Sequence, residues 1–171
     1  MTNPDKFLLL DSNVLSDYMR VSDQALRQTV RTVGQIYVPS TIVDECRDID
    51  YSDCERLGLI VVEPTFGQVA EASVRGGGLS FQDKICFLIC KEEGFVCVTN
   101  DKSLQKACKK AGVSTLWGLQ LLLELAKTGE MPTAEASSIA QEIQKSNPGF
   151  ISQKILGEFM EKLGNIKFDE H

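Results

Sequence analysis

Residues Lys6-Phe-Leu-Leu-Leu-Asp-Ser-Asn-Val-Leu-Ser-Asp17 contain an apolar run that has no helical period and ends abruptly at an acidic side chain. Four consecutive apolar residues, 7–10, are typical of a strand buried on both faces, as the first and central strand of a parallel sheet would be. Asp11 then lies at the carboxyl end of this strand, the edge at which ligands bind in open α/β sheets. A simpler interpretation is that Asp11 or Ser12 only caps the helix that follows.

The rest of the chain alternates strand and helix patterns. Further strands are expected at 36–38, 59–62, 95–99 and 113–116. Helices are expected at 13–20, from Ser22 to near Gly34, and at 65–74, 81–93, 103–111 and 119–126, with a polar segment at 48–56. Ser40 is expected to cap a further helix that carries Glu45. Strands separated by helices imply right-handed crossovers. We therefore predict an α/β fold, a three-layer α/β/α sandwich with a parallel sheet of about five strands.

The pattern changes beyond Gly129, where no further strand is expected. Thr133 is expected to cap a helix that runs to about Lys145, and a last helix is predicted at 151–163. We therefore divide the chain into a domain at 1–129 and a C-terminal helical extension at 130–171. The last helix carries an apolar stripe formed by Ile151, Ile155, Phe159 and Leu163. Such a stripe should pack on the parent domain or on a second subunit, and we predict a homodimer.

Composition and charge limit the function classes. The net charge of −6 argues against a protein that holds nucleic acid by bulk electrostatics, but not against a nuclease whose own carboxylates bind a cation. The polar residues 1–6 and the short apolar run after them fit neither a signal peptide nor a membrane span. We expect a cytoplasmic protein.

The cysteines and the histidine exclude several kinds of site. None of the six cysteines forms a Cys-x-x-Cys pair, and we interpret them as small core residues in a reducing compartment. The single histidine is the terminal His171, which removes Ser-His-Asp and Cys-His schemes. Catalysis would therefore depend on carboxylates, with a metal ion.

Four acidic residues are predicted to meet at the carboxyl edge of the sheet. Asp11 and Asp101 each follow a strand, Glu45 lies in the helix after the second strand, and Asp83 lies in the first turn of the helix before the fourth. Taken singly, Asp11 and Asp101 read as helix caps, Asp83 as the acidic half of a capping box and Glu45 as a solvated residue. Together they would repel one another unless a divalent cation offsets the repulsion, and an oxygen-only set favours Mg²⁺ or Mn²⁺.

Several segments together resemble the PIN-domain nucleases, whose best-known members are the VapC-type toxins of prokaryotic toxin–antitoxin pairs. The segments are Leu10-Asp-Ser-Asn-Val-Leu15, Val38-Pro-Ser-Thr-Ile-Val-Asp-Glu45, Leu79-Ser-Phe-Gln-Asp83 and Val98-Thr-Asn-Asp-Lys-Ser-Leu-Gln-Lys-Ala107 with Gly112. They match in order and spacing, and the resemblance covers about residues 6–128.

The resemblance implies a metal-dependent ribonuclease that hydrolyses RNA and leaves a 5′-phosphate and a 3′-hydroxyl. It implies that the metal ligands are Asp11, Glu45, Asp83 and Asp101, supported by Asn13 and Thr99. Nearby cations that would meet the RNA backbone are Lys84, Lys102 and Arg47. A toxin role would add an antitoxin protein as partner. The short segment between Glu45 and Asp83 and the helical tail depart from many toxins, which leaves the toxin role and its partner open.

Two alternative functions stay open. A degenerate PIN domain would keep the fold and act as an RNA-binding or scaffold module. A phosphate-transferring enzyme of the receiver or haloacid-phosphatase type also places acids at strand ends, but it needs a lysine at the end of a later strand. Thr99-Asn-Asp101 supplies no lysine in position, although Lys102 and Lys84 lie nearby. A nucleotide-binding fold lacks support, because Gly76-Gly-Gly78 matches no phosphate-binding loop.

Overall fold

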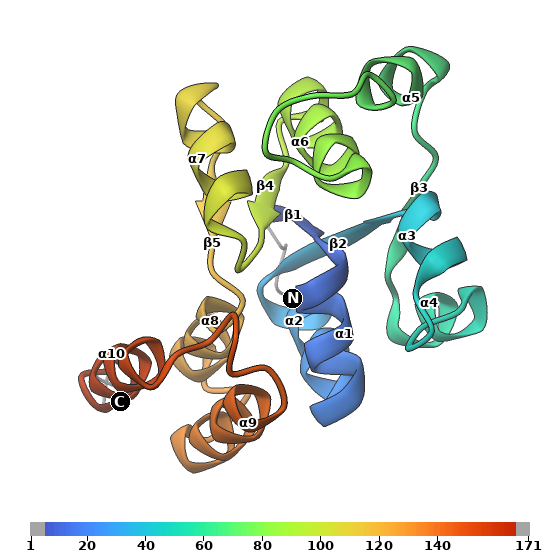
Figure 1. The fold of residues 1–171 in the computed structure, drawn as a ribbon. Coiled ribbons are helices and arrows are strands. Elements are labelled where there is room, and N and C mark those ends of the chain that lie inside the picture. The colour runs from blue at the N-terminus through green and yellow to red at the C-terminus, as the bar shows by residue number, and fades with distance from the viewer. Residues whose placement is uncertain (1–5, 167–171) are drawn as a thin grey trace.

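The computed structural model describes residues 6–166 and contains a five-stranded, fully parallel sheet in the order β3-β2-β1-β4-β5 (Figure 1). The strands are β1 (Lys6–Leu10), β2 (Gly34–Pro39), β3 (Ile60–Val62), β4 (Val96–Val98) and β5 (Thr115–Leu116). Chain order runs outward from β1 to β3 and then returns to β4 on the other side of β1. The strand order therefore reverses between β1 and β4, and at their carboxyl ends such a reversal opens a crevice.

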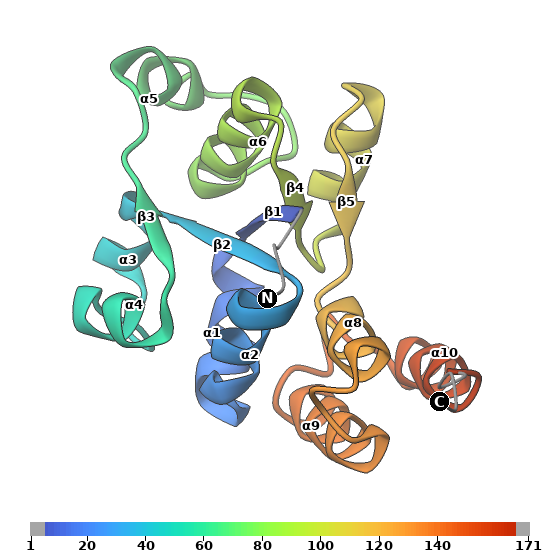
Figure 2. The same cartoon turned by 180° about the vertical axis from the view of Figure 1, so that it is seen from behind.

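Helices cover both faces of the sheet, as expected for a three-layer sandwich (Figures 1 and 2). One face carries α5 (Phe66–Ala72), α6 (Phe81–Glu93) and α7 (Lys102–Lys110). The other carries α1 (Ser12–Val21), α2 (Asp23–Thr32) and α8 (Gln120–Thr128), with α3 (Ser40–Glu45) and α4 (Tyr51–Leu57) near β3. The predicted fold class is confirmed.

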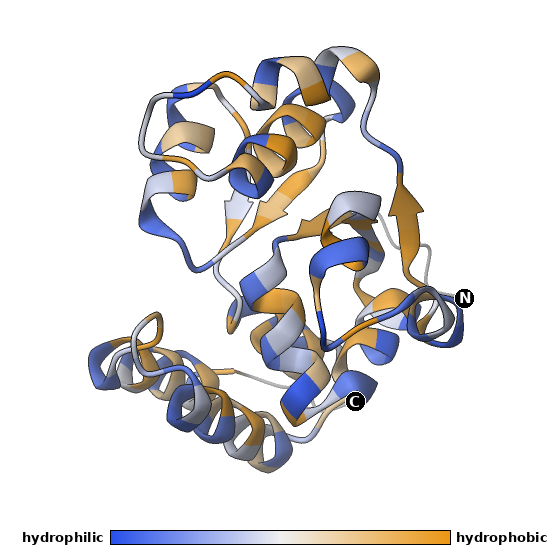
Figure 3. Cartoon of the chain, turned by 45° about the vertical axis from the view of Figure 1, so that its right-hand side comes forward, coloured by the Kyte–Doolittle hydropathy of each residue, from blue (hydrophilic) through white to orange (hydrophobic). Residues whose placement is uncertain are grey.

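The central strand is buried as predicted, except at its start. Leu8, Leu9 and Leu10 are fully buried, whereas Phe7 is 47% exposed. Phe7 instead joins Tyr37 and Phe95 in an aromatic cluster at the amino end of the sheet, where the last two rings stack with centroids 4.2 Å apart. Figure 3 shows the strands as mostly hydrophobic ribbons and the helices as mixed ones, the pattern of a buried sheet between amphipathic layers.

The polar segment at 48–56 contains a helix that the sequence pattern did not indicate. Helix α4 starts at a capping box in which Asp50 and Asp53 each accept a backbone N–H from the other, and it ends at Gly58 with φ of 77°. Its apolar contribution is only Cys54 and Leu57, both buried. Two apolar residues in seven are too few to produce a helical period in the sequence.

Two helix starts differ from the prediction in detail. Ser40 and Thr133 were expected to cap, but each is the first helical residue, and Pro39 and Pro132 hold the N-cap positions without a side-chain hydrogen bond. Proline has no polar side-chain atom, so neither residue can make the capping bond that a Ser or Thr at the N-cap would make. Of the cysteines, five are buried and Cys46 is half-buried, which agrees with the predicted core role.

The C-terminal helices α9 (Thr133–Ser146) and α10 (Gln153–Gly164) pack against α1 and α8. In the predicted stripe, Ile151, Phe159 and Leu163 are buried and Ile155 is half-buried, and all join the same hydrophobic core as the sheet. The parent domain therefore covers the stripe. The proposed boundary falls at Gly129, which ends α8 in the left-handed conformation (φ of 78°), and the division into two domains stays a prediction.

Within residues 6–166, no helix is long and apolar enough to cross a membrane. The predicted absence of a signal peptide concerns mainly residues 1–5, which lie outside the described part of the chain.

Candidate active site

Asp11 lies at the carboxyl end of β1 and caps α1, with only 2% of its surface exposed. Its backbone N–H continues the sheet by donating to the Val98 carbonyl at 3.1 Å. The side-chain Oδ1 accepts from the Val14 N–H at 2.9 Å, and Oδ2 accepts from the Thr99 hydroxyl. Both carboxylate oxygens of Asp11 are thus held in fixed positions at the β1–β4 crevice.

Thr99 links Asp11 to the second strand end. Its hydroxyl donates to Asp11 and accepts the Asp101 backbone N–H at 3.0 Å, so one buried side chain holds both acidic segments. Asp101 caps α7 by accepting the Leu104 N–H at 3.0 Å. Thr99 was predicted to support the site, and it contacts Asp11 directly.

Asp83 reaches the same region from α6. It forms a capping box with Ser80, whose hydroxyl accepts the Asp83 N–H at 3.1 Å while Asp83 Oδ2 accepts the Ser80 N–H at 3.3 Å. Burial raises the pKa of Asp11 from 3.8 to about 6, the hydrogen bonds from Thr99 and Val14 oppose this rise, and the negative charges of Asp83 and Asp101 add to it. Asp11, Asp83 and Asp101 therefore interact electrostatically at one edge of the sheet.

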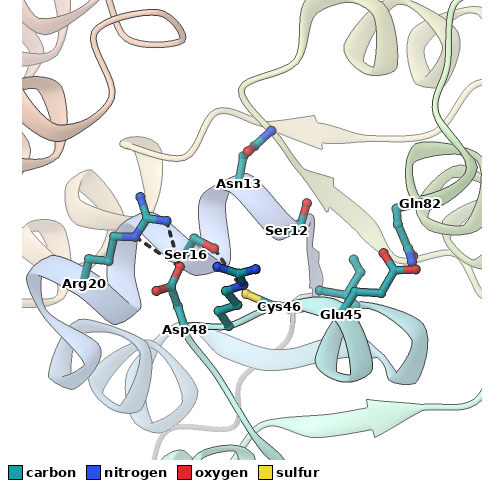
Figure 4. A pocket seen from close by; sticks show the side chains of 10 residues that line it. Ser12, Asn13, Ser16, Arg20, Glu45, Cys46, Asp48 and Gln82 are labelled. Atoms are coloured by element: carbon teal, nitrogen blue, oxygen red, sulfur yellow. Dashed lines mark hydrogen bonds and ion pairs between the residues drawn. The ribbon is translucent and has the colours of Figure 1, made fainter.

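Glu45 approaches from the other side, at a cleft of about 370 Å³ beside Asp11 (Figure 4). It lines this cleft with Ser12 and Asn13 of α1 and Gln82 of α6, and in Figure 4 the side chains of Glu45 and Gln82 lie side by side. Glu45 is exposed and is the last residue of the short helix α3, which ends after six residues. Its exposure agrees with the interpretation of Glu45 as a solvated residue.

Two hydrogen bonds tie α3 to α6 across the cleft. The Thr41 hydroxyl donates to Gln82 Oε1 at 2.8 Å, and Gln82 Nε2 donates to the Thr41 carbonyl at 3.3 Å. They fix the helix that carries Glu45 next to the helix that carries Asp83. The adjacent acid, Asp44, accepts from the Tyr51 hydroxyl at 2.7 Å and so faces α4 instead of the cleft.

The helix-cap interpretation is correct for Asp11 and Asp101, and the capping box is correct for Asp83. In residues 6–166, no three Asp, Glu, His or Cys side chains come together as a ready metal-binding group. A capping bond nevertheless uses only part of a carboxylate, which offers about four acceptor positions on its two oxygens. Asp11, Asp83 and Asp101 thus lie at one edge of the sheet and accept hydrogen bonds there, with acceptor positions left over.

The predicted substrate cations lie in three different places. Arg47 lines the same cleft as Glu45. Lys84 donates to the Val74 carbonyl at 2.6 Å and so holds the loop before α6. Lys102 is exposed at the start of α7 and lines a separate cleft on the far side of Asp101.

Sequence reasoning missed polar residues that shape this edge. Arg20, which the sequence did not indicate, pairs with Asp48 at 2.9 Å, and both side chains line the cleft. Asn100 is buried and its Oδ1 accepts the Gly118 N–H at 2.9 Å, while Gly118 accepts from the Tyr18 hydroxyl at 2.6 Å. A Cβ at Gly118 would lie 3.0 Å from the Asn100 side chain, so this close approach favours glycine. The hydrogen bonds from Asn147 to Asp17 were also missed.

Comparison with known proteins supports the fold. No family model and no curated protein sequence matches the chain. A PilT N-terminus (PIN) domain protein from the hyperthermophilic archaeon Sulfolobus solfataricus P2 is similar in structure, with a TM-score of 0.54, and the match covers 68% of this chain and 91% of that chain. The fold is PIN-like. At 15% identity the likeness extends to the PIN-like fold alone and does not reach the VapC type.

Proposed function

We propose that this PIN-like chain is a Mg²⁺- or Mn²⁺-dependent ribonuclease whose reaction takes place at the carboxyl edge of the sheet. The observation that carries the proposal is the convergence of Asp11, Asp83 and Asp101. They come from three separate elements, yet the Thr99 hydroxyl bonds both the Asp11 carboxylate and the Asp101 backbone N–H, and the charges of Asp83 and Asp101 add to the rise that burial causes in the pKa of Asp11. A fold has no structural need to concentrate like charges at one place, and a bound cation would offset their repulsion.

The side chains present fit a hard divalent cation. Asp11 and Asp101 would be the inner ligands, with Asp83 and Glu45 holding metal-bound waters or a second ion. All four supply carboxylate oxygens, the donors that Mg²⁺ and Mn²⁺ prefer. Bound there, the cation would lower the pKa of an attacking water and stabilise charge on the leaving oxygen.

The protein's own residues would position the reactants. Thr99 fixes the Asp11 carboxylate, and burial of Asp11 excludes competing water. Asn13 and Arg47 line the cleft where an RNA backbone would lie. Water would add to phosphorus as the bond to the 3′ oxygen breaks, and that oxygen would gain a proton. The products would be a 5′-phosphate and a 3′-hydroxyl.

The test compares three variants on single-stranded RNA with Mn²⁺ or Mg²⁺. Asp11→Asn and Glu45→Gln keep side-chain size and remove one charge each. Loss of an inner ligand should cost Asp11→Asn roughly a thousandfold in rate, or about 4 kcal/mol of transition-state stabilisation. Glu45→Gln should also lose activity. Asp44→Asn is the matched control, because Asp44 faces Tyr51, and it should cleave at the parent rate.

Two results would contradict the proposal. One is an Asp11→Asn variant that cleaves as fast as the parent. The other is a parent that cleaves no RNA and whose thermal melt ignores both Mn²⁺ and Mg²⁺. An acid-labile acyl phosphate trapped on Asp11 would instead support the phosphate-transferring alternative.

A further inference from the structure

A second cleft, of about 290 Å³, opens beside the carboxyl edge between the start of α7, α8 and α10. Its base includes apolar side chains from α8 and α10, among them Leu123, Ile155 and Phe159. Trp117, which follows β5, lines the same cleft and is half-buried, with its backbone N–H held by Gln120 Oε1 at 2.7 Å. A partly exposed indole beside an apolar base suits a flat aromatic ligand.

Lysines surround this cleft. Lys102, Lys154 and Lys162 line it and are exposed, against a single acidic residue, Glu158. Lys154 and Lys162 lie eight positions apart on α10, which is roughly 12 Å along one helix face. In a chain of net charge −6, three lysines around one cleft form a local positive region.

The cleft is continuous with two neighbouring features. Lys102 directly follows Asp101, so one end of the cleft begins at the candidate active site. At the other end it shares Gln120, Leu123 and Lys162 with a further hollow that Lys127 also lines. Figures 1 and 2 show α8 and α10 side by side below β5, and together these hollows form a groove along them, here called the tail groove.

We propose that the tail groove binds a single-stranded RNA segment adjoining the bond that is cleaved. A base would stack on Trp117, and the phosphates would meet Lys102, Lys154 and Lys162. Base stacking on aromatic side chains combined with a positive groove is the usual way in which proteins bind single strands without sequence preference. This inference rests on the proposed ribonuclease function and gives the helical extension a role in substrate binding.

The position of the groove favours nucleic acid over an acidic peptide. Both would satisfy the lysines, but only a nucleic acid strand would run on from the groove to the carboxylates around Asp101 as the same molecule. The test therefore treats a peptide as a competing outcome.

The experiment uses the fluorescence of Trp117, the single tryptophan of the protein. The full chain is titrated with a short oligouridylate in EDTA, so that no cleavage occurs. We expect quenching that saturates. The double variant Lys154→Glu/Lys162→Glu should bind at least about tenfold more weakly, with the slope of log K against log salt smaller by about 0.7 for each lost contact.

Two further variants sharpen the test. Lys110→Glu is the matched control, since Lys110 is an exposed lysine at the opposite end of α7 from the groove, and it should bind as the parent does. Glu158→Gln should tighten binding, because it removes the acidic residue of the groove. If these residues mattered only for folding, the lysine variants and Glu158→Gln, all on α10, would not change RNA binding in opposite directions.

Failure of this inference is distinguishable from failure of the ribonuclease. If oligouridylate does not quench Trp117, or if the groove variants bind like Lys110→Glu, the tail groove does not hold RNA, whether or not the parent cleaves it. Quenching by an acidic peptide but not by RNA also overturns the inference. Saturable quenching from a parent that cleaves no RNA and whose thermal melt ignores both Mn²⁺ and Mg²⁺ would support the groove and contradict the nuclease.

Discussion

Asp11 shows how one carboxyl can serve the fold at a cost in stability. The pKa of Asp11 is raised from 3.8 to about 6, chiefly by burial. Between these values the folded state binds more protons than the unfolded state, so stability falls as pH rises. The shift corresponds to about 3 kcal/mol, and the cost is present in full above pH 6.

Asp11→Asn should therefore stabilise the metal-free protein at neutral pH. We expect a gain of about 1–3 kcal/mol at pH 7.5 and almost none at pH 4, where the parent carboxyl is largely protonated in the folded state. Asparagine can still accept the Val14 N–H, so the cap survives. Urea denaturation of both proteins over this pH range measures the difference. A variant that is less stable than the parent at pH 7.5 would show that the cap outweighs the buried charge.

A bound metal ion should reverse the order of stability of the two proteins. If the carboxylates hold a cation, Mn²⁺ should raise the melting temperature of the parent and have much less effect on Asp11→Asn. The same melts thus separate ligand binding from the intrinsic cost of the charge.

Among the elements, α1 joins the candidate site to the helical extension. Asp11 caps its start, while Asp17 near its end is 2% exposed and accepts from Asn147 Nδ2 at 3.1 and 3.2 Å. Asn147 is the C-cap of α9 and begins the segment that leads to α10. Burial raises the pKa of Asp17 to about 6, and the Asn147 bond and the charge of Arg20 oppose that rise. A buried carboxylate with its donor thus anchors the tail.

Asn147→Ala should cost roughly 2–3 kcal/mol of unfolding free energy at pH 7.5, because it leaves a buried charge without its donor. The loss should shrink below pH 6, where Asp17 can take up a proton. The control is Gln153→Ala, which removes a less buried bond to Gln144 and should cost less than about 1 kcal/mol. Urea denaturation at both pH values measures these effects. Equal losses in the two variants would show that the Asp17–Asn147 bond stabilises the fold no more than the Gln153–Gln144 bond does.

At the scale of the whole molecule, the apolar stripe of α10 no longer requires a second subunit, since the parent domain buries it. The homodimer stays our proposal. Other large apolar side chains are exposed, among them Phe66 at 90% and Val74 at 66%, and a second copy could cover these. Light scattering at micromolar concentration should give twice the chain mass of 18.9 kDa, and a monomer would remove the proposal.

The toxin role is also a prediction for the whole molecule. It rests on the family resemblance and requires an antitoxin protein. A small protein encoded next to this chain that suppresses its RNA cleavage would support that role.

The sequence by itself determined the fold class and the edge at which the acids lie. A fully apolar run ending at Asp11 and a second ending before Asp101 predicted parallel strands, and parallel strands place their carboxyl ends at one edge. These signals are local, because burial on both faces and helix caps leave their pattern within a few residues. The helix caps at Asp11 and Asp101 followed from the same local pattern.

Only the tertiary structure decided which side chains meet. The Thr99 hydroxyl bonds Asp11 across 88 positions, and the Asn147 amide bonds Asp17 across 130 positions. The cleft between α8 and α10 likewise joins residues more than 30 positions apart. No periodicity records such pairs, since each depends on how helices pack across the sheet. The exposure of Phe7 was missed for the same reason, because the burial of a strand residue is set by neighbours distant in sequence. The short α4 was missed for a local reason, since only two of its seven residues are buried apolar ones. Packing therefore brought the charges of Asp83 and Asp101 close to the buried Asp11, with a groove beside them.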